Sequence, residues 1–592
     1  MKKNTFKANR FMKRTAGLAL ATAMMMSSLT GCGSESAATD TASSDSGSSS
    51  YSSSNATGNS KNKVSYEATA SDDSASDSYA MYETTESSYD GSSTSSAKRS
   101  TADYEDSYDS REYSHVSEND FIATSTEDTS TFSVDTDTAS YSNIRTYLNS
   151  YSTIPEDAVR IEEMVNYFHY DYKEPAKNEP FSVNMEVDNC PWNEDHQLVM
   201  IGLKTEEIDN SDRKPTNFVF LIDTSGSMNY SNKLPLVKTA FVKLLNELDE
   251  DDTVSIVTYA GTDTVVLEGE CGENTDVIAE AIENLSASGS TNGSAGINTA
   301  YEIAEKYFIK NGNNRVILAT DGDLNVGITS EDDLTDFISE KKESGIYLSV
   351  LGFGYDNLKD NKLEALADNG NGNYAYIDSV YEAKRVLVTE MGATLETVAK
   401  DVKIQTTFDS DVVEKYRLIG YENRMLANED FDDDSVDAGE IGAGHEVTAI
   451  YEIIPTDEAV KGGLDENHIL DLSIRYKEPD EDDSKLLKYA CNYSSDSFDN
   501  DASDNMLWAE SVACFGMFLQ DSEYAGDSSI ALARKLAKKT DYEDDALRVE
   551  YLELLDQAEE IYEVDYSYDY DDYDDDYDEY DDDVDVNVID AD

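Results

Sequence analysis

The sequence predicts a doubly wound α/β domain with a mainly parallel sheet, flanked by a β-sandwich and a helical C-terminal segment. Two observations indicate the α/β domain. Residues 216–396 contain short, almost continuously apolar runs rich in Val and Ile, namely NFVFLID, TVSIVTYA, NRVILATD and IYLSVLGFG. Runs of this kind are typical of strands that are buried on both faces. Helical patterns separate the runs, and this alternation favours parallel strands joined by crossover helices.

The helical pattern is clearest directly after the first of these strands. In KLPLVKTAFVKLLNELD the apolar side chains recur every three or four positions, at Leu234, Val237, Phe241, Leu244, Leu245 and Leu248. This spacing gathers them on one face of a helix, which can then pack against the sheet.

Strand-like segments precede and follow the α/β domain. FSVNMEVDNC and HQLVMIGLKT lie before it, and VKIQTTF, YRLIGYE, HEVTAIYEII, HILDLSIRYKE and LLKYACNY lie after it. Their composition predicts an antiparallel β-sandwich. We expect the pair near residues 180–204 to join this sandwich, so that the α/β domain is inserted into it. Residues 504–562 show helical patterns instead.

Acidic residues dominate the composition. The 592 residues include 45 Lys plus Arg and 124 Asp plus Glu, which gives a formal net charge of −79. This charge repels the phosphates of nucleic acids, and no basic patch offsets the repulsion. The composition therefore argues against nucleic-acid binding and favours the binding of cations.

Two segments are too polar to form a core. Ser, Thr, Asp and Tyr dominate from Gly33 to about Glu118, and the acidic run VDYSYDYDDYDDDYDEYDDDVDV follows residue 563. Neither segment can bury enough apolar area to offset the entropy of ordering, so both are expected to be disordered. We interpret the first as a tether and the second as a solubilising tail, with cation buffering by the tail as an alternative.

The N-terminus has the features of an export signal. Basic residues such as Lys2 and Arg14 precede the apolar stretch AGLALATAMMMSSL, which is short for a membrane-spanning helix, and LTGC follows at residues 29–32. LTGC resembles a bacterial lipobox, in which cleavage after Gly31 leaves Cys32 to be acylated. The sequence therefore predicts an exported lipoprotein on the extracytoplasmic face of the cell membrane. An ordinary signal peptide with a chance cysteine is the alternative.

These patterns divide the chain into seven segments. The expected boundaries are 1–31 for the signal peptide, 32–118 for the tether, 119–214 for an N-terminal segment of helices and then strands, 215–396 for the α/β domain, 397–498 for the β-sandwich, 499–562 for the helical segment and 563–592 for the acidic tail. Four cysteines remain in the expected folded segments, at Cys190, Cys271, Cys491 and Cys514. No CxxC pair occurs, and the sequence leaves their disulfide state open.

Oxygen-bearing side chains follow the strands of the α/β domain. Asp223 ends the first strand, and Ser225 and Ser227 follow it in FLIDTSGSM. Asp321 follows a later strand in LATDGD, and the Gly/Ser loop SGSTNGSAG offers Thr291. Ligands of a doubly wound sheet bind outside the carboxyl ends of its strands, so we expect these five side chains at one edge. Oxygen ligands of this kind suit Mg²⁺, Mn²⁺ or Ca²⁺ rather than zinc.

This set of residues resembles the metal-ion-dependent adhesion site of von Willebrand factor type A domains. The family pattern is D-x-S-x-S, a later loop threonine and a T-D-G after a buried strand, and it matches at Asp223, Ser225, Ser227, Thr291 and Asp321. EEMVNYF, NKLPLVK, GNGNYAYI, RLIGYENR and GEIGAGHEVTAIYE resemble bacterial surface lipoproteins that carry this domain between an N-terminal segment and a C-terminal extension. The resemblance covers roughly residues 115–560.

The resemblance implies that the serine and threonine hydroxyls contact the metal, whereas the two aspartates act partly through water. Neutral hydroxyls do not cancel the charge of a divalent ion, which therefore attracts one further anionic oxygen. An Asp or Glu carboxylate of a partner protein would supply that oxygen. The implied function is adhesion or surface assembly, with Mg²⁺ (or Mn²⁺ or Ca²⁺) as cofactor and a protein ligand as partner.

No enzyme motif accompanies this site. The sequence has no G-x-S-x-G elbow, HExxH, P-loop or G-x-G-x-x-G. All five histidines lie outside residues 216–396, so no general base is evident beside the metal. We therefore expect no enzymatic activity. A metal-dependent envelope-processing hydrolase and a structural envelope scaffold are the alternatives.

Overall fold

The fold is described from a computed structural model. It describes residues 111–562 except 116, 135–136, 178, 209–212, 291–292, 323–330, 343, 356, 391–394, 465–466, 480, 482 and 494–501. For residues 293–294 and 331–336 only the backbone is described. The expected signal peptide, the lipidation site Cys32, most of the tether and the acidic tail lie outside the described residues.

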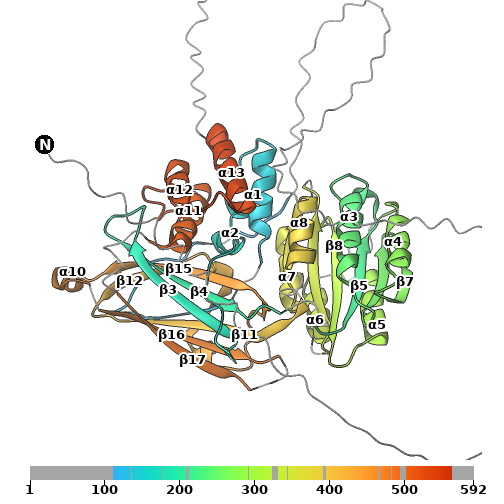
Figure 1. Ribbon diagram of the computed structural model, residues 1–592, viewed down its shortest axis with the longest axis horizontal. Coiled ribbons are helices and arrows are strands. Elements are labelled where there is room, and N and C mark those ends of the chain that lie inside the picture. Colours follow the sequence, from blue (N-terminus) through green and yellow to red (C-terminus); the bar gives the residue numbers. More distant parts are fainter. Residues whose placement is uncertain are drawn as a thin grey trace, which may run out of the picture. The chain divides into compact units, whose positions relative to one another are not determined.

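A six-stranded sheet forms the α/β domain (Figure 1). Its order is β10-β9-β8-β5-β6-β7, and all neighbours are parallel except β7, which runs antiparallel to β6. The strands are β5 (Thr216–Asp223), β6 (Thr253–Tyr259), β7 (Asp263–Cys271), β8 (Asn313–Thr320), β9 (Tyr347–Phe353) and β10 (Tyr374–Ile377). The side chains of β5 are buried along its whole length because helices cover both faces of the sheet. The predicted doubly wound fold is confirmed.

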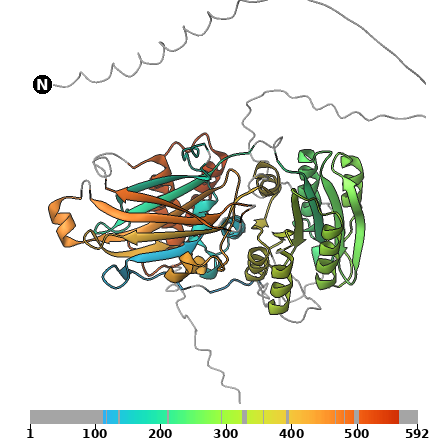
Figure 2. The same ribbon diagram turned by 90° about the horizontal axis from the view of Figure 1, so that it is seen from below.

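The helices of this domain divide between the two faces of the sheet (Figure 2). They are α3 (Leu234–Leu244), α4 (Thr275–Glu283), α5 (Gly293–Lys306), α6 (Glu331–Lys342), α7 (Asp360–Asn369) and α8 (Val380–Lys384). α3, α4 and α8 contribute to one hydrophobic cluster, whereas α5, α6 and α7 contribute to another. The predicted apolar face of α3 is buried against the sheet, where Phe241 stacks on Phe220 with ring centroids 4.4 Å apart.

Two further sheets pack face to face as a β-sandwich. One has the order β1-β12-β15-β4-β3 and the other β13-β2-β11-β16-β17, with β14 pairing with β11. The strands are β1 (Ile122–Ala123), β2 (Thr129–Ser133), β3 (Phe181–Asn189), β4 (Gln197–Thr205), β11 (Thr397–Phe408), β12 (Val413–Ile419), β13 (Met425–Leu426), β14 (Ile441–Gly442), β15 (Glu446–Pro455), β16 (His468–Lys477) and β17 (Lys485–Asn492). β4 pairs with β15, which lies on the other side of the α/β domain in the sequence. The α/β domain is therefore an insertion between two strands of the sandwich.

A helical cluster joins the N-terminal and C-terminal parts of the described chain. It contains α1 (Ala139–Asn149), α2 (Ile161–Asn166), α11 (Asp504–Leu519), α12 (Ile530–Ala537) and α13 (Ala546–Tyr562); the short α10 (Asp457–Gly462) lies between β15 and β16. The buried Arg145 guanidinium of α1 lies 2.7 Å from Asp378 and Glu382, which flank the start of α8, and 3.1 Å from Glu550 of α13. This network ties the α/β domain to the helical cluster.

The described residues bear on three further features of the chain: its cysteines, membrane-spanning helices and the boundary expected at residue 119. Cys190, Cys271, Cys491 and Cys514 carry free thiols there, and Cys514 is buried in the core of the helical cluster. Among the described residues, no helix has the length and hydropathy needed to span a membrane. Ordered contacts begin before the expected boundary at residue 119, since Glu112 forms a parallel bridge with Lys359.

Candidate metal centre

Asp223 lies at the centre of the carboxyl edge of the sheet. It is the last residue of β5, which pairs with β6 on one side and β8 on the other, and its side chain is 0% exposed. The Ser225 backbone N–H donates to Asp223 Oδ1 at 2.8 Å, an arrangement that Asp side chains commonly form two residues before a turn. The chain then forms a single turn of 3₁₀ helix, Gly226–Met228. This turn brings the Ser225 and Ser227 hydroxyls to within 2.8 Å of each other.

The Gly/Ser loop before α5 packs directly on this turn. Ser288 N donates to Thr224 O at 2.8 Å, and Gly226 N donates to Gly289 O at 3.1 Å. Gly289 has φ +88°, a conformation that residues with a side chain rarely adopt. These bonds bring the loop to the serine hydroxyls. Thr291, predicted on the same loop, lies outside the described residues.

Asp321 follows β8, the parallel neighbour of β5, so both aspartates reach the same edge. Its side chain is 0% exposed. Thr320, the last residue of β8, donates its hydroxyl to Asp223 Oδ2 at 3.4 Å. The structure thus brings together Asp223, Ser225, Ser227 and Asp321, four of the five predicted metal-site residues.

The two aspartates make the electrostatics of this edge unfavourable without a cation. Burial, together with the nearby negative charge of Asp321, raises the pKa of the Asp223 carboxyl from 3.8 to about 7. A buried carboxylate is costly unless a cation or hydrogen-bond donors compensate it. The edge is therefore suited to bind a positive charge.

The donor atoms fit a hard divalent ion. They are carboxylate and hydroxyl oxygens, which Mg²⁺, Mn²⁺ and Ca²⁺ accept as ligands. No group of three or more His, Cys, Asp or Glu side chains able to hold a metal occurs among the described residues. A metal at this edge would therefore depend on the hydroxyls of Ser225 and Ser227, because Asp223 and Asp321 are its only two predicted acidic ligands.

Lys233 is a component of this site that the sequence reasoning missed. It immediately precedes α3 and is 1% exposed, and its Nζ lies 3.0 Å from Asp321 Oδ2 and 3.1 Å from Asn357 Oδ1. The segment NKLPLVK contains it, but a lysine before an apolar helix is normally solvated. Only the packing of the loops after β5 and β9 reveals its role.

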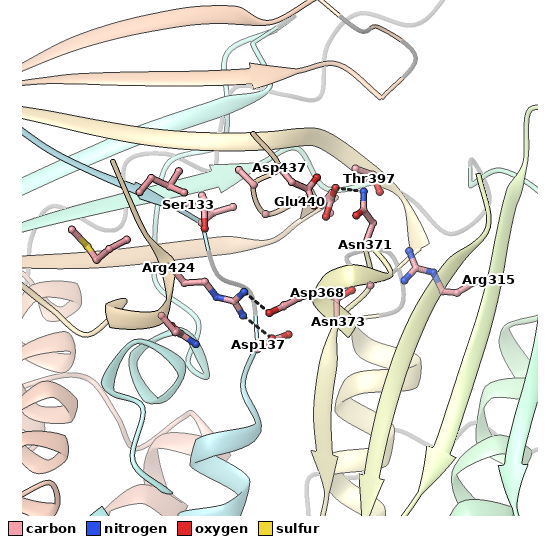
Figure 3. A pocket seen from close by; sticks show the side chains of 18 residues that line it. Ser133, Asp137, Arg315, Asp368, Asn371, Asn373, Thr397, Arg424, Asp437 and Glu440 are labelled. Carbon is pink, nitrogen blue, oxygen red and sulfur yellow. Dashed lines mark hydrogen bonds and ion pairs between the residues drawn. The ribbon is translucent and has the colours of Figure 1, made fainter. Parts of the chain in front are cut away.

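A separate polar pocket of about 230 Å³ lies near the start of β8 (Figure 3). This is the opposite end of the strand from the carboxyl edge that holds Asp223 and Asp321, which we call the metal edge. Its charged groups face one another: Arg424 lies 3.2 Å from Asp137 and 2.7 Å from Asp368, and Asn371 donates to Glu440 at 2.5 Å. Burial, together with repulsion by neighbouring acids, raises the pKa of the Glu440 carboxyl from 4.5 to about 8. We interpret this pocket as a polar contact between the α/β domain and the sandwich, because Arg424 pairs with Asp368 across it and Glu440 accepts a hydrogen bond from Asn371.

Comparisons with known proteins agree with this architecture. Three family models match: von Willebrand factor at residues 107–200, von Willebrand factor type A domain at residues 217–389, and "Uncharacterized protein YfbK, C-terminal" at residues 393–561. Together they cover the described α/β domain and the segments on both sides of it.

Individual relatives extend the comparison. The protein YfbK of Escherichia coli (strain K12) is 38% identical over 457 residues, which cover 73% of this chain and 78% of YfbK. Protein sll0103 of Synechocystis sp. is 30% identical over 194 residues, which cover 33% of this chain and 44% of that protein. A solved structure, the von Willebrand factor type A protein from Catenulispora acidiphila, shows 16% identity and a TM-score of 0.38, covering 64% of this chain and 90% of its own. The chain therefore belongs to the family of YfbK, and its von Willebrand factor type A domain lies between two further segments that family models match.

Proposed function

We propose that this protein is a receptor that binds a partner protein through a divalent metal ion at the carboxyl edge of its α/β domain. The observation that carries the proposal is the pair of serine hydroxyls, 2.8 Å apart, beside the buried carboxylates of Asp223 and Asp321. Von Willebrand factor type A domains commonly mediate protein interactions or adhesion, and they commonly bind a divalent metal at such a site.

Each residue has a distinct role in this proposal. Ser225, Ser227 and Thr291 would hold the ion through their hydroxyls, and Asp223 and Asp321 would hold it partly through water. The ion supplies a strong positive charge that the neutral hydroxyls do not cancel. An Asp or Glu carboxylate of a partner would supply one further anionic oxygen, and adhesion or surface assembly would be the resulting role.

We also propose that the receptor is exported and anchored by lipid at Cys32. The support is the order of basic residues, apolar stretch and LTGC at the N-terminus. Acyl chains on this cysteine would hold the protein to the extracytoplasmic face of the membrane, and the polar tether would separate the folded region from the lipid. No specific observation favours the hydrolase alternative, so we propose a binding protein rather than an enzyme.

Metal binding is the first test. Mn²⁺ affinity is measured by titration for the wild type, for Asp223→Ala and for the matched control Asp276→Ala. Asp276 is exposed at the start of α4, just after β7, whose antiparallel direction places its end at the opposite edge of the sheet. Asp223→Ala should bind Mn²⁺ about 10–100-fold more weakly, as expected for removal of a ligand that acts partly through water. The control should bind it as the wild type does.

Partner binding is the second test. The wild type should capture envelope proteins in Mg²⁺, lose them in EDTA and regain them when Mg²⁺ is restored, whereas monovalent salt should not substitute. Asp223→Ala should fail to capture them although its circular dichroism spectrum shows it to be folded. Equal capture by the folded variant, together with no effect of EDTA, would show that the metal edge is not the receptor site.

A further inference from the structure

The lysine at the metal edge occupies a site shaped to hold it. Lys233 is buried, and its ammonium lies between Asp321 Oδ2 at 3.0 Å and Asn357 Oδ1 at 3.1 Å. Its aliphatic chain passes over Gly354, which has φ +80°, and a Cβ added at that position would collide with Lys233 Cε. Burial of an ammonium group is costly unless it is paired and hydrogen-bonded. The pairing partner here is one of the predicted metal-site aspartates.

We propose that Lys233 is a fixed positive charge of the metal centre, which positions Asp321 and strengthens the attraction of the loaded site for a carboxylate. This inference rests on the proposed function, because it deepens the role of the same site. A divalent ion balances the two aspartates, and the ammonium then adds a positive charge beside them. The partner's carboxylate therefore meets a more positive site than the metal and its ligands alone would create.

The same charge has two further consequences. In the metal-free protein the ammonium lies beside Asp321 and offsets part of the repulsion between the two buried aspartates. In the loaded protein it repels the metal ion, so Lys233 lowers metal affinity while raising affinity for the carboxylate. A lysine that only supported the local fold would not produce these opposite effects on two ligands.

The experiment separates charge from packing with three substitutions in the full chain. Lys233→Gln removes the charge and keeps a hydrogen-bond donor, whereas Lys233→Arg keeps the charge. Lys243→Met removes an equal charge from the same helix, about 15 Å along its axis. The first probe is Mn²⁺ alone, and its binding is measured by electron paramagnetic resonance. The second probe is acetate, and its binding is measured by its effect on the relaxation of water protons at bound Mn²⁺. Thermal unfolding in EDTA and in Mn²⁺ provides a measurement independent of acetate.

We expect Lys233→Gln to bind Mn²⁺ about tenfold more tightly than the wild type and to bind acetate about tenfold more weakly. It should also unfold at a lower temperature in EDTA, and Mn²⁺ should raise that temperature more than it does for the wild type. Lys233→Arg should retain acetate binding, and Lys243→Met should match the wild type throughout.

Three results would overturn the inference, and they differ in what they say about the receptor. If the affinities of Lys233→Gln for Mn²⁺ and acetate lie within twofold of those of the wild type, Lys233 has no electrostatic role. The proposed metal site is not contradicted by that result. If the wild type itself binds no Mn²⁺, the proposed function fails together with the inference. If Lys233→Gln does not fold, Lys233→Arg still decides: a folded Arg variant that loses acetate binding contradicts a role for charge.

Discussion

Replacing Asp223 with Asn is expected to stabilise the metal-free protein while weakening its response to Mg²⁺. The substitution removes one negative charge and preserves the shape of the side chain. In the wild type, Ser225 N lies 2.8 Å from Asp223 Oδ1 and the Thr320 hydroxyl lies 3.4 Å from Asp223 Oδ2. In the variant, the Asn carbonyl can still accept a hydrogen bond from Ser225 N, and the Asn amide can donate one to the Thr320 hydroxyl. The fold of the turn should therefore survive.

The size of the effect follows from the pKa of Asp223. Burial and the charge of Asp321 raise this pKa from 3.8 to about 7 in the folded protein, so the folded state binds the proton more tightly than the unfolded state. The stability this provides is complete below pH 3.8 and is lost as pH rises to about 7. Each pKa unit corresponds to about 1.4 kcal/mol, so the variant should be more stable than the wild type by about 2–4 kcal/mol at pH 8.

The assay is urea unfolding of the wild type, Asp223→Asn and the exposed control Asp276→Asn. In EDTA, the free energy of unfolding of Asp223→Asn should exceed that of the wild type by a small amount at pH 4 and by a larger amount at pH 8. The control should show neither this increase in stability nor its pH dependence. Mg²⁺ should stabilise the wild type and the control more than it stabilises Asp223→Asn. The reasoning would be refuted if Asp223→Asn were less stable than the wild type in EDTA at pH 8. It would also be refuted if Mg²⁺ stabilised Asp223→Asn as much as it stabilises the wild type.

Three further substitutions test other parts of the chain. Arg145→Met leaves the buried carboxylates of Asp378 and Glu382 without their shared guanidinium, so urea unfolding should show a loss of about 3–5 kcal/mol, and an unchanged midpoint would contradict the network's role. Glu440→Gln should be more stable than the wild type by about 1–3 kcal/mol above pH 8 and equally stable below pH 4.5. The reason is that a carboxyl with a raised pKa in the folded state destabilises the fold as pH rises. A difference in stability that does not depend on pH would contradict this prediction. Cys32→Ala should lose labelling by a fatty-acid analogue and membrane retention, and retention of both would end the lipoprotein proposal.

Sequence patterns alone predict the α/β domain and place Asp223 and Asp321 at the carboxyl edge of its sheet. Continuous apolar runs marked β5, β6, β8 and β9 because strands covered on both faces need apolar residues at every position. Parallel strands end at a common edge, so Asp223 and Asp321 could be placed together although nearly a hundred residues separate them. Both inferences depend on local pattern and on a topology that permits few arrangements.

The contacts between distant segments become visible only in the folded chain. The pairing of β4 with β15 makes the α/β domain an insertion, and backbone pairing across more than two hundred residues leaves no local signal in the sequence. The contacts of Arg145 with α8 and α13 likewise join three separated segments. From its sequence context, Lys233 would be expected at the surface. In the folded chain it is a buried charge beside Asp321, because the loops after β5 and β9 pack around it. Burial and charge pairing depend on the surroundings of a residue in space, and those surroundings are supplied by distant parts of the chain.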